Sequence, residues 1–216
     1  MANKNLTEIV FILDRSGSMS GLEADTIGGY NSLLEKQKKE TGEAVVTTVL
    51  FDDQYDMLCD HADIKKIPTM TEEEYYARGC TALLDAIGKT INHVGNRQKY
   101  APDNEVPGKT MVVITTDGYE NASREFSQPQ IKTMIEQQKE KYGWEFLFLG
   151  ANIDAVSTAR NYGIAPDRAV KYEADSVGTR TNFDAVSETV SCVREARPIT
   201  SDWKKDIEEH LKKRNR

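Results

Sequence analysis

The hydrophobic pattern of the chain alternates between short apolar runs and longer stretches with helical periodicity. Five segments have the apolar or β-branched character of strands: residues 6–13, 44–51, 110–116, 145–149 and 169–172. Continuous apolar runs of this kind are typical of strands that are buried on both faces of a parallel sheet. Residues 55–64 follow the second strand after a short polar turn, so we expect them to pair with it in antiparallel fashion at a sheet edge.

Between these strands, apolar residues recur every three or four positions, which predicts helices that pack against the sheet. The predicted helices cover residues 22–39, 71–77, 82–98, 128–142, 153–162 and 183–196. The helix over 71–77 is predicted from the capping-box pattern Thr71-Glu-Glu-Glu74, and the Pro-containing stretch 100–108 is expected to be a surface loop. The alternation predicts a doubly wound, Rossmann-like α/β/α fold of three layers, with a mostly parallel central sheet and one antiparallel edge strand.

A single domain is expected to account for most of the chain. A length of 216 residues favours one large domain, which we place at residues 1–198, followed by a charged helical tail at 199–216. In the tail, Trp203, Ile207 and Leu211 recur at four-residue spacing on an otherwise polar helix. We expect this stripe to dock on the domain, and a partner-binding helix is the alternative.

Composition narrows the classes of function. The net charge of −7 argues against a general attraction to nucleic acid or to an anionic membrane surface. No run approaches the roughly 18 apolar residues of a membrane span, and the N-terminus lacks the apolar core of a signal peptide. The three cysteines are far apart, so the sequence predicts neither a disulfide framework nor a CxxC zinc site. A cytoplasmic location is the simplest expectation.

Oxygen-bearing side chains gather where strands are predicted to end. Ligands of doubly wound sheets bind beyond the carboxyl ends of the central strands, where the strand order reverses. Two carboxylates and three hydroxyls can meet there if the strands 6–13 and 110–116 are neighbours. The five candidate ligands are Asp14, Ser16, Ser18, Thr81 and Asp117. Such an oxygen-only set favours Mg²⁺, Mn²⁺ or Ca²⁺ over zinc or copper.

Each of these residues also has a simpler interpretation. The loop after Asp14 could cap the following helix, and Asp117 with Gly118 could form an ordinary turn after a strand. Asp52 and Asp53 are expected to form a β-turn pair rather than to support a metal site. Asp85 is expected to cap its own helix or to pair with a nearby cation.

The pattern Asp14-x-Ser16-x-Ser18, followed by Thr81 and by Asp117, resembles the metal-ion-dependent adhesion site (MIDAS) of von Willebrand factor A (VWA) domains. The resemblance covers about residues 5–196, and all five positions hold the expected residue type. It implies direct contacts of Ser16, Ser18 and often Thr81 with the metal, whereas Asp14 and Asp117 act largely through water. Mg²⁺ is the expected cation, with Mn²⁺ or Ca²⁺ as alternatives.

The same resemblance implies that an acidic side chain of a partner completes the coordination of the metal. Without a signal peptide or a disulfide pattern, the chain is most similar to stand-alone bacterial or phage members of the family. Cys80 departs from the pattern, because a second Gly or Ser usually precedes the Thr. It is still small, so the loop is expected to close.

The function that follows is a non-enzymatic, divalent-metal-dependent protein-binding domain, whose unidentified partner bears an exposed Asp or Glu. Gly118, Glu120 and Asn121 are the candidates for contacts with that partner. A self-assembling scaffold with a vestigial metal site and a metal-dependent phosphohydrolase are the alternatives. A phosphatase of the haloacid dehalogenase kind needs a second Asp two residues after the first, where this chain has Ser16. The G-x-S-x-G, G-x-G-x-x-G and P-loop patterns are also missing.

Overall fold

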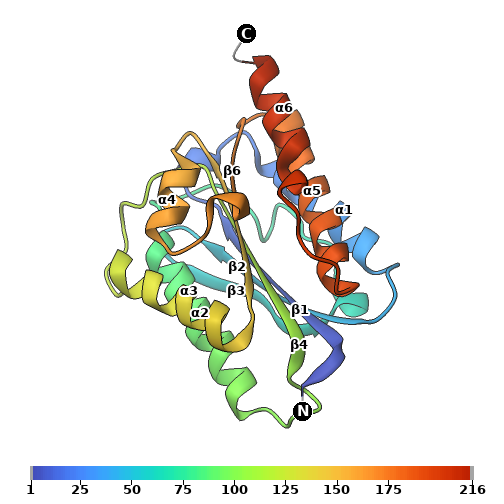
Figure 1. The fold of residues 1–216 in the computed structure, drawn as a ribbon. Helices are drawn as coiled ribbons and strands as arrows, with labels where there is room; N and C mark the ends of the chain where they lie inside the picture. Colours follow the sequence, from blue (N-terminus) through green and yellow to red (C-terminus); the bar gives the residue numbers. More distant parts are fainter. Residues whose placement is uncertain (1, 215–216) are drawn as a thin grey trace.

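The computed structural model describes residues 2–214 and shows a six-stranded sheet between two layers of helices (Figure 1). The strands are β1 (Asn3–Asp14), β2 (Glu43–Phe51), β3 (Tyr55–Asp63), β4 (Pro107–Thr116), β5 (Glu145–Ala151) and β6 (Ala169–Tyr172). They lie in the order β3-β2-β1-β4-β5-β6, and every neighbouring pair is parallel except β2 with β3. The predicted doubly wound α/β fold with one antiparallel edge strand is therefore confirmed.

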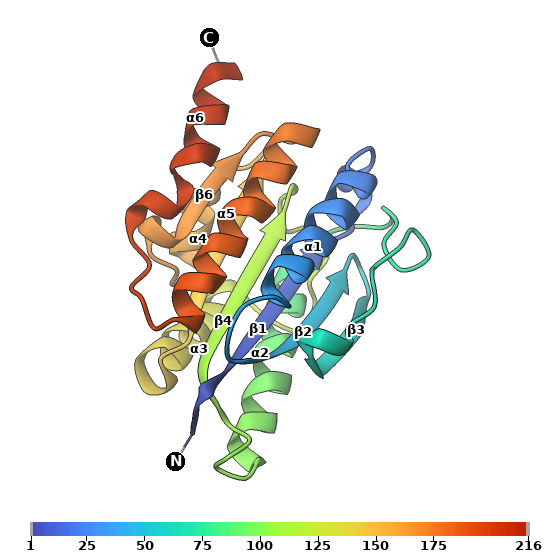
Figure 2. The ribbon, with the colours of Figure 1, turned by 90° about the vertical axis from the view of Figure 1, so that its right-hand side faces the viewer.

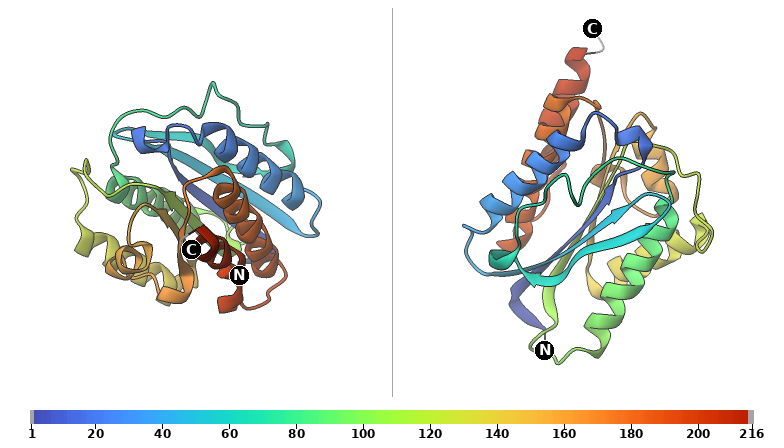
Figure 3. Two further views of the ribbon diagram at one scale, coloured as in Figure 1. Left: turned by 90° about the horizontal axis from the view of Figure 1, so that it is seen from above. Right: turned by 180° about the vertical axis from the view of Figure 1, so that it is seen from behind.

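Within the described residues, six α-helices cover the two faces of this sheet. They are α1 (Glu23–Gln37), α2 (Leu83–Tyr100), α3 (Gln128–Tyr142), α4 (Ala155–Asn161), α5 (Ser176–Arg194) and α6 (Lys205–Arg214). Helices α1, α5 and α6 lie in front of the sheet in Figure 2, whereas α2, α3 and α4 lie behind it. The view from above in Figure 3 shows the sheet between these two layers.

Strand β1 is buried on both faces, which explains its unbroken apolar sequence. Its odd-numbered residues from Ile9 to Leu13 pack into the core under α1 and α5, and Val10 and Ile12 pack into the core under α2, α3 and α4. Each such burial stabilises the fold by roughly 1.5–3 kcal/mol relative to an exposed side chain. This placement fixes β1 at the centre of the sheet, next to β4.

One buried carboxylate, Glu8, lies in the amino-terminal half of the sheet. It accepts hydrogen bonds from Thr47 at 3.0 Å and Gln98 at 2.9 Å, and it pairs with Arg97. Burial by itself raises the pKa of Glu8, but its interactions with His61, Arg97 and Gln98 outweigh burial and lower that pKa below the ordinary value. Glu8 is thus a charged group held inside the fold by α2 and β2.

The prediction of a helix over residues 71–77 is wrong, because the chain there makes a single turn. Thr71 does form the predicted capping contacts, since its backbone N–H donates to the Glu74 carboxylate at 2.8 Å. The next residue, Tyr75, is fully buried, and its hydroxyl donates to the backbone oxygen of Asp14 at 2.5 Å. This contact holds the segment against the carboxyl end of β1 in place of a second helical turn.

Several other boundaries differ from the prediction, among them the starts of α5 and β4. Helix α5 begins at Ser176 instead of residue 183, because the Asp175 side chain caps it by accepting the Gly178 N–H at 2.7 Å. Strand β4 begins at Pro107, inside the stretch that was expected to be a loop up to residue 108. Both differences lengthen elements whose first residues are not apolar.

The predicted docking of the C-terminal stripe is confirmed for Ile207 and Trp203. Ile207 is 1% exposed and belongs to the core shared with α5 and β6. Trp203 packs against the same core, and its indole N–H donates to the backbone oxygen of Asp167 at 2.7 Å. The last two residues of the predicted tail, 215–216, lie outside the described residues. Within residues 2–214, no helix is long and apolar enough to cross a membrane.

Candidate metal centre

The register of the two central strands brings the two candidate carboxylates to one edge of the sheet. Strands β1 and β4 are parallel neighbours, and Leu13 pairs with Thr115. Asp14 is the last residue of β1, and Asp117 directly follows β4, so both lie at the carboxyl edge of the sheet. The arrowhead of β4 points to this edge in Figure 2. Asp14 and Asp117 are both buried, with 1% and 2% of their surface exposed.

Three hydroxyl groups converge on the same place. The Ser16 Oγ lies 3.1 Å from the Ser18 Oγ, and the Thr81 hydroxyl donates to the Ser16 Oγ at 3.0 Å. The Ser18 hydroxyl donates to Oδ1 of Asp117. Ser16 and Thr81 are buried, whereas Ser18 is exposed, so this cluster of oxygens opens to solvent at Ser18. The structure thus links four of the five predicted ligands in one chain of contacts.

The fifth residue, Asp14, lies beside this chain and is held rigidly. Its Oδ1 accepts the Ser16 backbone N–H at 2.7 Å, and its Oδ2 accepts the Thr116 hydroxyl at 2.6 Å. Burial raises the pKa of Asp14 to about 6, with a smaller contribution from the negative charge of Asp117, while hydrogen bonds from Thr116 and Ser16 oppose the rise. The negative charge of Asp117 thus acts on the buried Asp14 carboxyl.

Asp117 has an unused oxygen at the centre of this arrangement. Its Oδ2 is buried and has no hydrogen-bond partner among the described residues. Burial raises the pKa of Asp117, and the hydrogen bond from Ser18 only partly opposes it. A buried polar atom without a partner is costly, and a bound cation would satisfy it and offset the repulsion of Asp14. The residues present therefore fit a divalent cation.

The chemistry of the donors restricts which cation fits. Within residues 2–214, no group of three or more His, Cys, Asp or Glu side chains is placed to hold a metal. The centre instead combines serine and threonine hydroxyls with carboxylates, which are the hard oxygen ligands that Mg²⁺, Mn²⁺ and Ca²⁺ prefer. Neutral hydroxyls also leave more of the cation's charge available to an external carboxylate.

Backbone contacts lock the loop that carries Thr81 onto the loop that carries Ser16. The Gly17 N–H donates to the Gly79 carbonyl at 3.1 Å, and the Arg78 N–H donates to the Arg15 carbonyl at 2.8 Å. Gly79 has φ +67°, and a Cβ atom there would lie 2.1 Å from Oδ1 of Asp53. The positive φ favours glycine at this position, where the two loops meet.

A buried ion-pair cluster beneath these loops was not predicted from the sequence. The Asp52 carboxylate accepts a hydrogen bond from Nε of Arg15 at 3.0 Å and another from Nε of Arg78 at 2.7 Å. Burial by itself raises the pKa of Asp52, but the hydrogen bonds from Arg78 and Gln54 and the charge of Arg15 lower it overall. The expected turn is present, since Oδ1 of Asp52 accepts the Gln54 N–H at 2.6 Å. Asp52 thus also connects the loop that carries Ser16 with the loop that carries Thr81.

The loop after β4 contains the three residues that were suggested for partner contacts. Gly118 adjoins the centre, because a Cβ atom there would lie 3.1 Å from the Ser18 Oγ. Glu120 accepts the Leu84 N–H at 2.9 Å, and Oδ1 of Asn121 accepts the Thr81 N–H at 2.9 Å. The last two side chains thus hold α2 and the Thr81 loop in place. Contact with a partner stays a prediction for all three.

Of the two roles expected of Asp85, the cap of its own helix is absent, but a nearby cation is present. Burial by itself raises the pKa of Asp85, and backbone hydrogen bonds together with the charge of Lys89 outweigh burial and lower that pKa. Asp85 does not cap its own helix, because its carboxylate accepts backbone N–H groups from the loop after β4. The donors are Arg124 at 2.8 Å, Glu125 at 2.9 Å and Phe126 at 2.9 Å. Asp85 therefore fastens this loop to α2, one helical turn away from Thr81.

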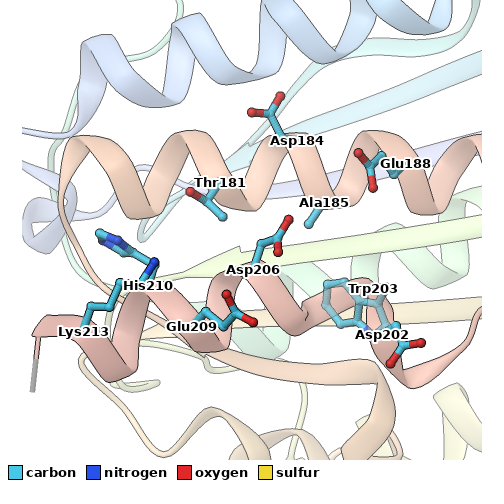
Figure 4. Close-up of a pocket in the computed structure, with 10 residues that line it drawn as sticks. All are labelled: Thr181, Asp184, Ala185, Glu188, Asp202, Trp203, Asp206, Glu209, His210 and Lys213. Atoms are coloured by element: carbon cyan, nitrogen blue, oxygen red, sulfur yellow. The ribbon is translucent and has the colours of Figure 1, made fainter.

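A groove of about 390 Å³ lies between α5 and α6, away from the residues of the candidate centre (Figure 4). Figure 4 shows side chains from the two helices facing one another across it. Its lining consists of Thr181, Asp184, Ala185, Glu188, Asp202, Trp203, Asp206, Glu209, His210 and Lys213. One of its carboxylates, Asp184, already pairs with Lys36 at 2.6 Å. The groove shares no residue with the candidate metal centre.

Comparison with known proteins identifies the fold. No protein-family model matches the sequence, and no curated protein matches it. Among solved structures, a von Willebrand factor type A protein from Catenulispora acidiphila superposes with a TM-score of 0.57 at 15% identity. The fold is that of a VWA domain. That match covers 86% of this chain and 42% of the other.

Two further matches are with larger proteins. Proximal thread matrix protein 1 from the mussel byssus, solved with a zinc-occupied MIDAS motif, has a TM-score of 0.59 at 15% identity, over 88% of this chain and 46% of that protein. The pilus adhesin SpaC from Lactobacillus rhamnosus GG has a TM-score of 0.65 at 12% identity, over 88% of this chain and 30% of the adhesin. The chain thus spans less than half the length of each of these three proteins.

Proposed function

We propose that this chain is a non-enzymatic protein-binding domain that presents a divalent cation to an acidic residue of a partner. The observation that carries the proposal is the cluster of the Ser16, Ser18 and Thr81 hydroxyls, which contact one another in turn and reach Asp117 through Ser18. This cluster opens to solvent at Ser18. In this proposal, Ser16, Ser18 and Thr81 contact the metal, and Asp14 and Asp117 supply the balancing negative charge. Mg²⁺ is the expected cation.

The electrostatics of the centre favour binding over catalysis. A cation that contacts mainly neutral hydroxyls keeps a net positive charge toward solvent, and a partner carboxylate would complete its coordination. A phosphohydrolase would need an available nucleophile, but both oxygens of Asp14 already accept hydrogen bonds, and Asp14 is 1% exposed. Its carboxylate is therefore suited to holding the loop rather than to attacking a substrate.

Two of the similar structures support this proposal by analogy. The mussel byssus protein holds zinc in its MIDAS motif, and SpaC is an adhesin. The identities of 15% and 12% leave the nature of any partner of this chain to experiment.

The proposal is tested with immobilised peptides that contain a single Asp, compared with otherwise identical peptides that contain Asn. We expect the protein to bind the Asp peptides in Mn²⁺, and to lose this binding in EDTA or after Ser16→Ala. Ser20→Ala is the matched control, because Ser20 is exposed in the same loop and its side chain forms no hydrogen bond within the described residues. Binding that is equal for Asp and Asn peptides, or unchanged in EDTA, would contradict the proposal.

A further inference from the structure

A cavity of about 410 Å³ lies directly beside the candidate metal centre, between the start of α2, the loop after β4, and α4. Gly118 belongs to both features. It lines the cavity, and a Cβ atom at Gly118 would lie 3.1 Å from the Ser18 Oγ and 3.3 Å from the Thr81 Oγ1. Since an extended chain advances about 3.3–3.6 Å per residue, a peptide bound at the cation reaches this cavity within one or two residues.

The inner wall of the cavity is apolar. Leu83, Leu84 and Ile153 line it and are 1%, 8% and 3% exposed. Tyr162 also lines the cavity and is 5% exposed, and its ring packs edge-on against Phe148 at 6.0 Å. The rim carries Tyr119, which is 63% exposed, and polar side chains that include the exposed Gln128 and Asn161 and the half-buried Thr158. The apolar surface is therefore confined to the inner wall. This wall suits a side chain with an apolar body.

The charges around the cavity disfavour a second acidic side chain of the ligand. Its ionisable carboxyl groups belong to Glu120 and Asp154, and no Lys or Arg from the described residues lines it. Both carboxylates are engaged in holding backbone, since Glu120 accepts the Leu84 N–H at 2.9 Å and Asp154 accepts the Ser157 N–H at 3.0 Å. A negative group of the ligand is therefore directed to the cation, while the cavity takes an uncharged neighbour.

We propose that this cavity binds an aliphatic or aromatic side chain of the partner, located one or two residues from the acidic residue that completes the cation's coordination. The inference rests on the proposed function and adds a sequence preference to it. The partner motif is then a carboxylate next to an apolar side chain, read by two adjoining sites that share Gly118.

The test uses an array of acetylated peptides in which a single Asp lies among alanines and one position within two residues of it varies. The protein is applied in Mn²⁺ and, separately, in EDTA. We expect Leu, Met, Phe or Trp at one of the varied positions to strengthen Mn²⁺-dependent binding at least about tenfold over Ala, as for burial of a large apolar side chain.

A variant that fills the cavity separates this inference from the proposed function. Ser157 lines the cavity from the exposed side of α4, so Ser157→Trp blocks the cavity without altering the core. We expect Ser157→Trp to abolish the preference for an apolar neighbour and to keep the Mn²⁺-dependent requirement for Asp. Arg160→Trp is the matched control, because Arg160 is exposed on the same helix outside the cavity lining, and it should retain the preference.

Four results would overturn the inference. Asp-dependent binding without any preference at neighbouring positions would refute the cavity's role and leave the proposed function intact. A preference for Lys or Arg would show that the occupant is cationic instead, and an apolar preference that survives Ser157→Trp would place the apolar contact elsewhere. Absence of Mn²⁺-dependent binding to every peptide would remove the proposed function and this inference together.

Discussion

Replacing Asp52 by alanine is expected to destabilise the fold strongly, because it leaves a buried guanidinium without its main partner. Asp52 is fully buried, and the Arg15 side chain that donates to it at 3.0 Å is 4% exposed. Without Asp52, Arg15 retains its pair with the half-exposed Asp56, a hydrogen bond of 3.3 Å to the Glu74 carbonyl and its place over the Tyr76 ring. Because the Arg15 guanidinium is buried, loss of its partner Asp52 leaves a charge that water cannot solvate, which lowers the free energy of unfolding.

Removal of one partner from a buried ion pair costs about 3–5 kcal/mol. Because Asp56 still neutralises part of the Arg15 charge, we expect the lower end of this range, about 3 kcal/mol. For a domain of this size, each kcal/mol corresponds to roughly 2–4 °C in the melting temperature, so the expected decrease is about 6–12 °C.

Urea unfolding followed by circular dichroism, in EDTA, measures this effect independently of metal binding. Asp184→Ala is the matched control, because the Asp184 pair with Lys36 is short, at 2.6 Å, but both side chains are about half exposed. Exposed pairs of this kind contribute about 0.2–1 kcal/mol. A loss of less than about 1 kcal/mol in Asp52→Ala, or equal losses in the two variants, would refute the reasoning.

Three further predictions concern other parts of the molecule. The pKa of Glu8 is lowered in the folded state, so the ionised carboxylate stabilises the fold fully above the unfolded-state pKa of 4.5, and this stabilisation is lost as the pH falls through the folded-state pKa. Glu8→Gln should therefore flatten the acid side of the stability profile, measured as urea midpoints from about pH 3 to 7. Asp85→Ala frees three backbone N–H groups, so stability should fall by about 1.5–3 kcal/mol and the amides of residues 124–126 should exchange faster in hydrogen-exchange measurements. Gly118→Ala places a methyl group 3.1 Å from the Ser18 Oγ, so Mg²⁺ affinity measured by calorimetry should fall about tenfold or more.

Each of these predictions has a result that contradicts it. Parallel stability profiles for wild type and Glu8→Gln would show that Glu8 does not contribute to the loss of stability in acid. Unchanged amide exchange in Asp85→Ala would mean that the loop after β4 is held by other contacts. Wild-type Mg²⁺ affinity in Gly118→Ala would place the cation away from Ser18.

The order and type of most elements follow from the hydrophobic pattern, because the elements that bury whole faces carry it clearly. The pattern fails where polar residues are buried. Helix α5 begins seven residues earlier than predicted, and its first two turns bury Thr179 and Asn182, whose polar side chains hide the helical periodicity. The turn at Thr71 has the capping residues of a helix, but no helix follows, because Tyr75 is buried against the end of β1. The contact of Tyr75 with Asp14 joins residues that are distant in sequence, so no local pattern predicts it.

For the candidate centre, the sequence predicts the five candidate ligands, but it does not predict the buried contacts that hold their loops in place. Asp14, Ser16, Ser18, Thr81 and Asp117 are recognisable because each follows the end of a strand or opens a helix in a fixed order. Their assignment as metal ligands stays a prediction. The pairing of Arg15 with Asp52 and the anchoring of the loop by Asp85 join segments that are distant in sequence, and a charged residue near a turn is ordinarily a surface residue.

Isothermal titration of the metal-free protein with Mg²⁺ tests the central claim most directly. We predict that wild type and Ser20→Ala each bind one Mg²⁺ per chain, and that Ser16→Ala, which removes the hydroxyl between Ser18 and Thr81, does not. Mn²⁺ should compete for the same site. The absence of binding to wild type at millimolar Mg²⁺, or equal binding by Ser16→Ala, would contradict the claim that these hydroxyls hold a cation.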